Sequence, residues 1–210
     1  MAYEDFTTYV EADPGSDITV TANKLDVWEI PNNVDAWVYA DKGAGHFGTT
    51  FEHDFKLKIE YDRYNRAGSV WGVSNVVEDA YYWSANNSQA LYVLHVYDNR
   101  IQLREAEATD SDIYTGSQDS TYYPTAERTG DTTAVLRIYS DEAQTDLLDT
   151  LAVAVPSGRS YRYMFAYASW NTGDAGYISH EIENLDLNEG APPAGLDIAI
   201  AMHHYEMLRN

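Results

Sequence analysis

Aromatic residues and amides lie together in two short stretches of this sequence. The first is residues 81–87 (YYWSANN) and the second is residues 169–174 (SWNTGD). Sugar rings stack on exposed aromatic planes, and sugar hydroxyls bond to neighbouring amides and carboxylates. The side chains expected to contact a glycan are Trp83, Asn86, Asn87, Trp170, Asn171 and Asp174. The alternative interpretation is that both tryptophans fill the ends of a folded core.

Paired carboxylates are the second kind of candidate, because glycan-cleaving enzymes use two of them about 5 to 9.5 Å apart. Alternate residues of a strand point to the same side about 6.5 Å apart, and Glu52 with Asp54 and Glu60 with Asp62 have this spacing. With 34 acidic residues in the chain such pairs arise by chance, and these two alternate with lysines, as on a solvated sheet face. We therefore predict no catalytic residues and no enzymatic activity.

Acidic loops offer ligands for a hard cation, because calcium binds several carboxylate and carbonyl oxygens. The loops that carry such acids are residues 13–17, 32–35, 110–112 and 141–146. None matches a complete calcium-loop pattern, so calcium is the one cofactor we consider and its ligands are not assigned. Among the histidines there is no HExxH motif, and His53 is in phase with Phe51 and Phe55, which predicts a hydrogen-bonded histidine at the edge of the core.

Composition excludes several classes of partner. The net charge of -21 disfavours nucleic acid and anionic membrane surfaces. The absence of cysteine excludes disulfides and thiolate metal sites. The first thirteen residues show neither a basic region nor an apolar run, and nowhere do 18 apolar residues follow one another, so we predict no signal peptide and no membrane span.

The elements that must position these residues are strands. Residues 51–62 (FEHDFKLKIEYD) alternate without a break between an apolar and a charged side, which predicts a half-buried antiparallel strand. Asp98 and Asn99 separate two apolar runs and predict a hairpin. We expect loops at residues 78–89 and 109–120. The other predicted strands cover residues 6–10, 17–30, 35–41, 70–77, 91–97, 100–105, 133–139, 147–155, 161–169 and 177–187. The pattern favours an all-β, two-sheet antiparallel jelly-roll sandwich with a short C-terminal tail.

The chain divides at a Pro/Gly-rich stretch. Residues 1–188 form the predicted jelly-roll domain, residues 189–196 (EGAPPAGL) a linker, and residues 197–210 an apolar tail. The tail fits either a helix or a strand, and docks either on its own domain or on a neighbouring subunit. The residues expected to make that contact are Ile198, Ile200, Met202, Tyr205 and Leu208.

Several stretches of the chain also resemble a known family. They are residues 35–39, 42–47, 51–53, 71–75, 121–123, 127–128, 138–141, 147–151 and 183–187. On these residues the chain is similar to the concanavalin A-like lectin/glucanase jelly rolls, in particular laminin-G-like proteins found among phage structural genes. The resemblance implies two curved antiparallel sheets with the last strand beside the first. The glucanases carry ExDxxE or ExDxE on one strand, whereas Glu60-Tyr61-Asp62 lacks the third carboxylate.

The sequence thus favours a non-enzymatic protein that acts through its surfaces. We expect a virion or extracellular assembly subunit, with other protein subunits (a second copy or a virion protein) bound through residues 197–210 and glycans contacted by the end loops. The alternatives are a carbohydrate-binding module and a polysaccharide-cleaving enzyme, either a glycoside hydrolase or a lyase. Product release from a polysaccharide would identify the enzyme, and binding without cleavage the module.

Overall fold

The computed structural model describes residues 3–63, 66–173 and 176–189, and the side chains of all of these except Asp62 and Arg63. The predicted linker after Glu189 and the tail contact residues from Ile198 to Leu208 lie outside the described residues, so the division into domain, linker and tail stays a prediction. Within the described ranges, no helix has the length and apolar character needed to cross a bilayer.

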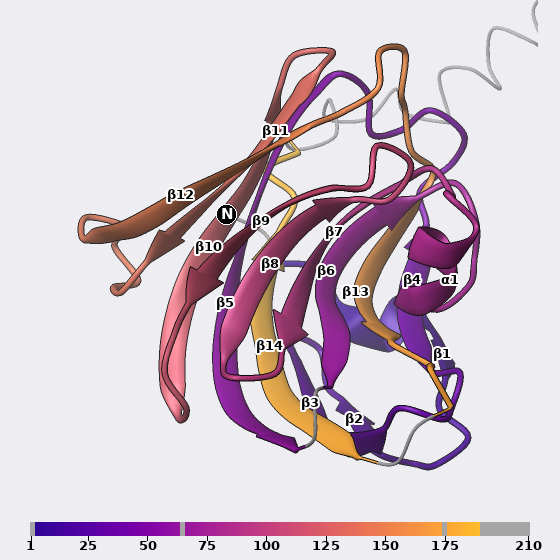
Figure 1. Ribbon diagram of the computed structural model, residues 1–210, viewed down its shortest axis with the longest axis vertical. Helices are drawn as coiled ribbons and strands as arrows, with labels where there is room; N and C mark the ends of the chain where they lie inside the picture. Colours follow the sequence, from indigo (N-terminus) through magenta and orange to yellow (C-terminus); the bar gives the residue numbers. More distant parts are fainter. Residues whose placement is uncertain (1–2, 64–65, 174–175, 190–210) are drawn as a thin grey trace, which may run out of the picture.

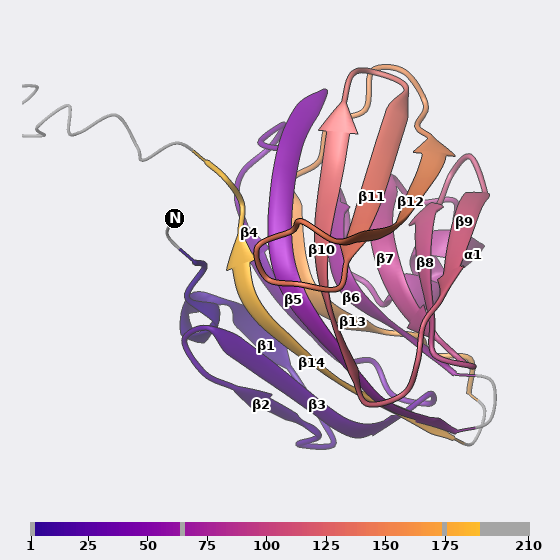
Figure 2. The same ribbon diagram turned by 90° about the vertical axis from the view of Figure 1, so that its left-hand side faces the viewer.

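The chain forms two seven-stranded sheets that lie face to face (Figure 1, Figure 2). In spatial order, sheet A contains β1 (Val10–Ala12), β4 (Trp37–Asp41), β13 (Tyr163–Ser169), β6 (Ala67–Ser74), β7 (Ala90–Val96), β8 (Arg100–Glu105) and β9 (Asp110–Thr115). Sheet B contains β12 (Leu147–Ala154), β11 (Thr133–Tyr139), β10 (Ser120–Thr129), β5 (Thr50–Arg63), β14 (Tyr177–Asp186), β3 (Lys24–Pro31) and β2 (Ile18–Val20). Every pairing is antiparallel, which confirms the predicted all-β sandwich.

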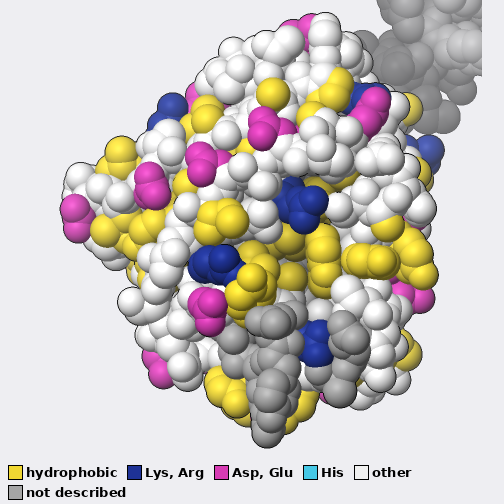
Figure 3. Space-filling model, viewed as in Figure 1, with side chains coloured by type: hydrophobic (Ala, Val, Ile, Leu, Met, Phe, Trp, Pro, Cys, Tyr) yellow, Lys and Arg dark blue, Asp and Glu magenta, His cyan; other side chains and the backbone are white. Residues whose placement is uncertain are grey.

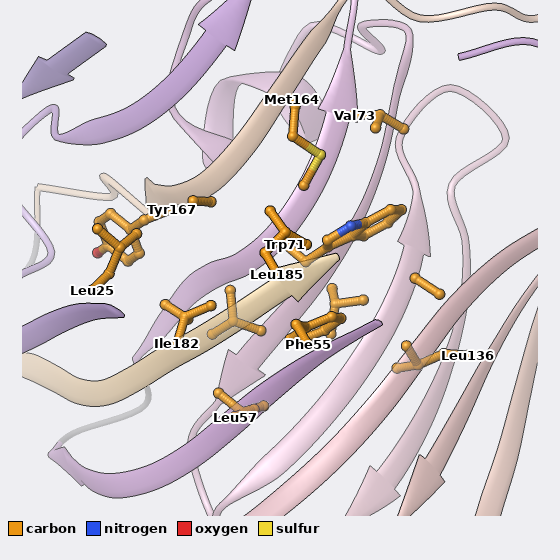
Figure 4. Close-up of a cluster of buried hydrophobic side chains, with 14 of the residues drawn as sticks. Leu25, Phe55, Leu57, Trp71, Val73, Leu136, Met164, Tyr167, Ile182 and Leu185 are labelled. Atoms are coloured by element: carbon orange, nitrogen blue, oxygen red, sulfur yellow. The ribbon is translucent and has the colours of Figure 1, made fainter. Parts of the chain in front are cut away.

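Strand alternation places the core between the sheets. On β5, Phe55, Leu57 and Ile59 are buried while the residues between them face solvent. Figure 4 shows side chains of sheet B facing Trp71 and Met164 of sheet A across the interior. Burial of such apolar surface contributes about 25 cal/mol per Å², and in a chain without disulfides it is the main stabilising term.

The last strand, β14, lies between β5 and β3. The resemblance implied that the last strand lies beside the first. Instead, β14 pairs with β3, which lies in the second predicted strand, residues 17–30. The predicted hairpin is confirmed, since β7 and β8 pair across Asp98 and Asn99, whose φ angles are 61° and 56°. Both residue types tolerate these left-handed angles.

Two predicted loops are wrong. Residues 109–120 contain β9, which pairs with β8 although only Ile113 and Tyr114 are apolar. Residues 78–89 contain a short helix, α1 (Ala80–Ala85). The only other helical segment in the described ranges is the 3₁₀ turn η1 (Phe6–Thr8).

The edges of the two sheets are joined on one side by carboxylates of β9. Asp112 accepts a hydrogen bond from the backbone of Ala152 at 3.2 Å, and Asp110 accepts one from Ala154 at 2.7 Å. Both donors belong to β12, the edge strand of sheet B, so these backbone groups do not remain open.

Candidate functional site

The helix α1 packs on the outer face of sheet A. Asp79 is its N-cap residue and accepts hydrogen bonds from the backbone of Tyr81 at 2.8 Å and of Tyr82 at 3.2 Å. This cap explains why a helix begins here, because carboxylates stabilise the free N–H groups of a first turn. Trp83 anchors the helix, with its ring centroid 4.8 Å from that of Phe165 on β13 and 5.3 Å from that of Tyr92 on β7.

Trp83 therefore cannot bind a glycan, and its prediction as a contact residue is wrong. Its exposed fraction is 0%, because α1 presses the indole into a second hydrophobic cluster formed with Phe165 and Tyr92. The alternative interpretation, a buried tryptophan, is correct for this residue. The most exposed aromatic side chain of α1 is Tyr82, whose exposed fraction is 44%.

The two predicted aromatic stretches meet on this face. The ring centroids of Tyr81 and Trp170 are 5.6 Å apart in an edge-to-face arrangement, and both side chains are partly exposed. The guanidinium carbon of Arg104, on β8, lies 5.7 Å from the Trp170 ring centroid. Arg104 also donates a hydrogen bond to the hydroxyl of Ser84 on α1 at 3.0 Å. An arginine over a tryptophan face is a favourable cation–π contact.

A polar group borders these rings. The Asn171 side chain donates a hydrogen bond to the Asp35 carboxylate at 2.7 Å. Burial raises the pKa of Asp79 to about 6, as does the nearby charge of Asp35, while backbone hydrogen bonds from Tyr82, Tyr81 and Asn171 act in the opposite direction. Asp79 thus binds both α1 and the segment after β13, and holds the two stretches in one position.

We call the group formed by these side chains the sheet A site. Its members are Asp35, Tyr81, Tyr82, Arg104, Trp170 and Asn171. Figure 3 shows a band of hydrophobic side chains across this face, with lysine and arginine side chains set in it and acidic side chains around it. Apolar and aromatic surface with a few polar groups is the usual composition of a small-molecule site.

The remaining predicted residues have mixed outcomes. Asn86 and Asn87 directly follow α1 and are exposed, and the Asn86 amide donates to Glu78 at 3.2 Å. Asp174 lies outside the described residues. Sequence reasoning missed Asp35 and Arg104. The alternation in RIQLRE contained the signal for Arg104, because buried Ile101 and Leu103 force it to the outer face.

One cluster of described residues could bring three carboxylates to a metal ion. Asp26, Glu60 and Glu181, on the outer face of sheet B, place one oxygen each within 4.8 Å of one another. However, the ammonium of Lys24 lies 2.8 Å from Glu181, and that of Lys58 lies 2.6 Å from Glu60. Two lysines thus pair with two of the three carboxylates, so the cluster fits an ion-pair network better than a calcium site.

The acidic loops predicted as calcium sources have other roles in the structure. Asp13 accepts from the backbone of Ile18 at 2.8 Å, and Asp141 accepts from the backbone of Asp146 at 2.7 Å. Asp110 and Asp112 bind the edge of β12. These carboxylates stabilise turns and a sheet edge, and calcium remains a prediction without assigned ligands.

Comparisons with known proteins agree with the fold. No protein-family model matches the chain, and no curated protein matches its sequence. A functionally unknown protein from Saccharomyces cerevisiae is similar in structure, at 11% identity and a TM-score of 0.56, over 89% of this chain and 100% of that chain. The legume lectin-like domain from Entamoeba histolytica matches at 12% identity and a TM-score of 0.53, over 87% and 90% of the two chains.

The exoplasmic/lumenal domain of VIP36, in a form bound to Ca²⁺ and mannose, matches at 8% identity and a TM-score of 0.52, over 84% of this chain and 83% of that chain. At such identities the likeness establishes the fold and not the ligand. The chain has the concanavalin A-like sandwich fold of the legume lectin-like proteins.

Proposed function

We propose that this protein binds carbohydrate, without cleaving it, through the sheet A site. The observation that supports this most is that two sequence stretches about 90 residues apart place Tyr81 and Trp170 against each other on one face, where both stay partly exposed. Partly exposed rings beside a carboxylate and an amide offer stacking surfaces and hydrogen-bonding groups together.

The site is held in place before any ligand arrives. The buried Trp83 and the Asp79 cap fix α1, and Asn171 is bound to Asp35. Side chains that are already ordered lose little entropy on binding, which favours affinity. The likeness to the mannose-bound form of VIP36 and to a legume lectin-like domain supports the same function.

A binding assay on a glycan panel tests this proposal. Trp170→Ala should weaken binding by about tenfold or more, if a sugar ring gains about as much from stacking on an aromatic ring as a base does, about 1–3 kcal/mol. Trp28→Ala is the matched control, because Trp28 is 58% exposed and lies on β3 of sheet B. Each protein is assayed with calcium and with chelator, and the glycans are checked for cleavage products.

Trp170 packs partly against the second hydrophobic cluster, so the fold of the variant is checked by thermal unfolding. Tyr82→Ala serves as a second variant that removes an exposed ring. Equal loss of binding in Trp28→Ala, or no loss in either sheet A variant, would contradict the proposal. Release of cleavage products would favour the enzyme alternative.

An assembly role is the second candidate, and it rests on the apolar residues 197–210 of the sequence. Light scattering on the full chain and on a chain stopped at Glu189 tests it. A larger mass for the full chain alone would support a subunit that assembles through its tail, and equal masses would contradict it.

A further inference from the structure

Two arginines on the outer face of sheet A have no ion-pair partner among the described residues. They are Arg100 and Arg104, which with Gln102 form the outward side of β8, opposite the buried Ile101 and Leu103. Most described cationic side chains do form ion pairs: these are Lys24, Lys42, Lys56, Lys58, Arg128, Arg137, Arg159 and Arg162. In a chain of net charge -21, two unpaired arginines on the outward side of one strand, with only Gln102 between them on that side, are unexpected.

The surroundings of these arginines contain no carboxylate on the flanking strands. On the same side of the sheet as these arginines, the facing residues of β7 and β9 are all uncharged: Tyr92, Leu94, Val96, Ser111, Ile113 and Thr115. The acids of β9, Asp110 and Asp112, point to the opposite side and bind the backbone of β12. The flanking strands therefore place no acidic side chain on the same side as the arginines, and Figure 3 shows lysine and arginine side chains within the hydrophobic band of this face.

Arg104 is held in a position suited to an anion. Its side chain is half-buried, with the guanidinium against Trp170 and one hydrogen bond to Ser84, and its Nε atom is buried without a hydrogen-bond partner. A partly desolvated guanidinium with unused donors costs free energy. A planar carboxylate recovers that energy, because it accepts two parallel hydrogen bonds from a guanidinium.

Arg100 extends the feature along the strand. Its guanidinium carbon lies 3.9 Å from the centroid of the Tyr97 ring, and its Nε donates to the backbone carbonyl of Tyr97 at 3.0 Å. Arg104 follows four positions later on the strand, a rise of about 13 Å. A single carboxylate cannot reach both arginines, whereas an extended polymer with repeated carboxylates can.

We propose that the ligand of the sheet A site is an acidic polysaccharide, whose uronate carboxylates bind Arg104 and Arg100. This inference rests on the proposed function and names its ligand class. The net negative charge of the protein does not exclude it. At physiological ionic strength the Debye length is about 8 Å, so a ligand on this face responds mainly to the nearby arginines.

Isothermal titration at about 0.15 M ionic strength tests the proposal with two matched polymers, polygalacturonate and the same polymer after methyl esterification. Esterification removes the charge and leaves the sugar backbone unchanged. We expect the acidic polymer to bind at least about tenfold more tightly than its methyl ester. In Arg104→Gln, the affinity for the acidic polymer should fall to about the affinity for the ester. Arg100→Gln should reduce it by a smaller factor, since Arg100 already donates to a backbone carbonyl.

Arg162→Gln is the matched control. Arg162 also lies by an aromatic ring on sheet A, 5.0 Å from the Tyr163 centroid, but it is paired with Asp41 at 2.6 Å. The control should keep the preference for the acidic polymer. An unchanged preference in Arg104→Gln, or equal loss in Arg162→Gln, overturns the assignment of the arginines.

The failure of this inference can be told apart from the failure of the proposed function. If neutral glycans bind as tightly as polygalacturonate, and Trp170→Ala abolishes that binding, the glycan function stands and the acidic ligand is wrong. If neither the polymers nor the glycan panel bind, both proposals are overturned.

Discussion

The outer faces of the two sheets differ although both sheets have seven antiparallel strands. On sheet B, lysines and glutamates of neighbouring strands form pairs, such as Lys56 with Glu183 at 2.9 Å and Lys58 with Glu181 at 3.2 Å. The outer face of sheet A instead carries aromatic rings and two arginines without ion-pair partners among the described residues, Arg100 and Arg104.

The pKa shifts reflect the paired state of sheet B. Partial burial raises the pKa of Glu181, but hydrogen bonds from Lys24 and Lys58 outweigh it and hold that pKa below its ordinary value. Alternation along a strand decides which residues face outward, and the cross-strand neighbours decide whether those residues pair with one another or stay available to a ligand.

The largest expected effect concerns the interior that both faces share. His95 of sheet A and His180 of sheet B meet there with their Nδ1 atoms 3.4 Å apart, and His53 accepts a hydrogen bond from Trp71 at 3.2 Å. Burial lowers the pKa of His53 and of His95 to about 3 and that of His180 well below 6.5. The folded protein therefore keeps these rings neutral.

An unfolded histidine has a pKa of about 6.5, so below that pH the unfolded chain takes up protons that the folded chain does not. The free energy of unfolding should fall by about 2 kcal/mol per histidine at pH 5. Asp79 offsets about 1 kcal/mol of this fall in the free energy of unfolding, because its raised pKa lets the folded protein also take up a proton at pH 5. Urea unfolding at pH 7.5, 6 and 5 measures the balance, and equal stability at all three would contradict it.

The next effect distinguishes the support of the sheet A site from its surface. Trp83→Ala should lower the free energy of unfolding by about 3 to 5 kcal/mol, as expected for a large buried side chain, and should also abolish glycan binding because α1 loses its anchor. Tyr82→Ala on the same helix should leave stability within about 0.5 kcal/mol. Denaturant unfolding of both variants gives the comparison, and similar losses in the two would contradict the assigned roles.

The smallest effect is expected on sheet B. Lys58→Met removes a lysine that pairs with Glu60 and Glu181, and partly exposed pairs are worth about 0–1 kcal/mol. Glycan binding should not change, because this face carries no part of the site. If binding fell in Lys58→Met, the division of roles between the two sheets would be wrong.

Most of the fold could be predicted from strand patterns in the sequence. The alternation in residues 51–62 appears as β5, and the hairpin at Asp98 forms as expected. The patterns failed where contacts made elsewhere decide the structure. β9 is a strand because it pairs with β8 and faces β12, and its own residues are mostly polar.

The site could be predicted only in part. Both aromatic stretches were recognised, but the helix between Asp79 and Asn86 was not, and it buries Trp83 while it exposes Tyr82. A six-residue helix leaves little periodicity to detect, so only its N-cap gave a signal. The unpaired state of Arg104 depends on strands β7 and β9 and cannot be read from the residues next to it in sequence.

The hydrogen bonds from β12 to Asp110 and Asp112 also bear on aggregation. An open edge strand can recruit an extended segment of another molecule, and a row of such additions is how fibrils grow. In this protein two backbone donors of the β12 edge are occupied by carboxylates, and those carboxylates would repel an approaching acidic chain. This edge is therefore protected against strand addition by further copies of the same acidic protein.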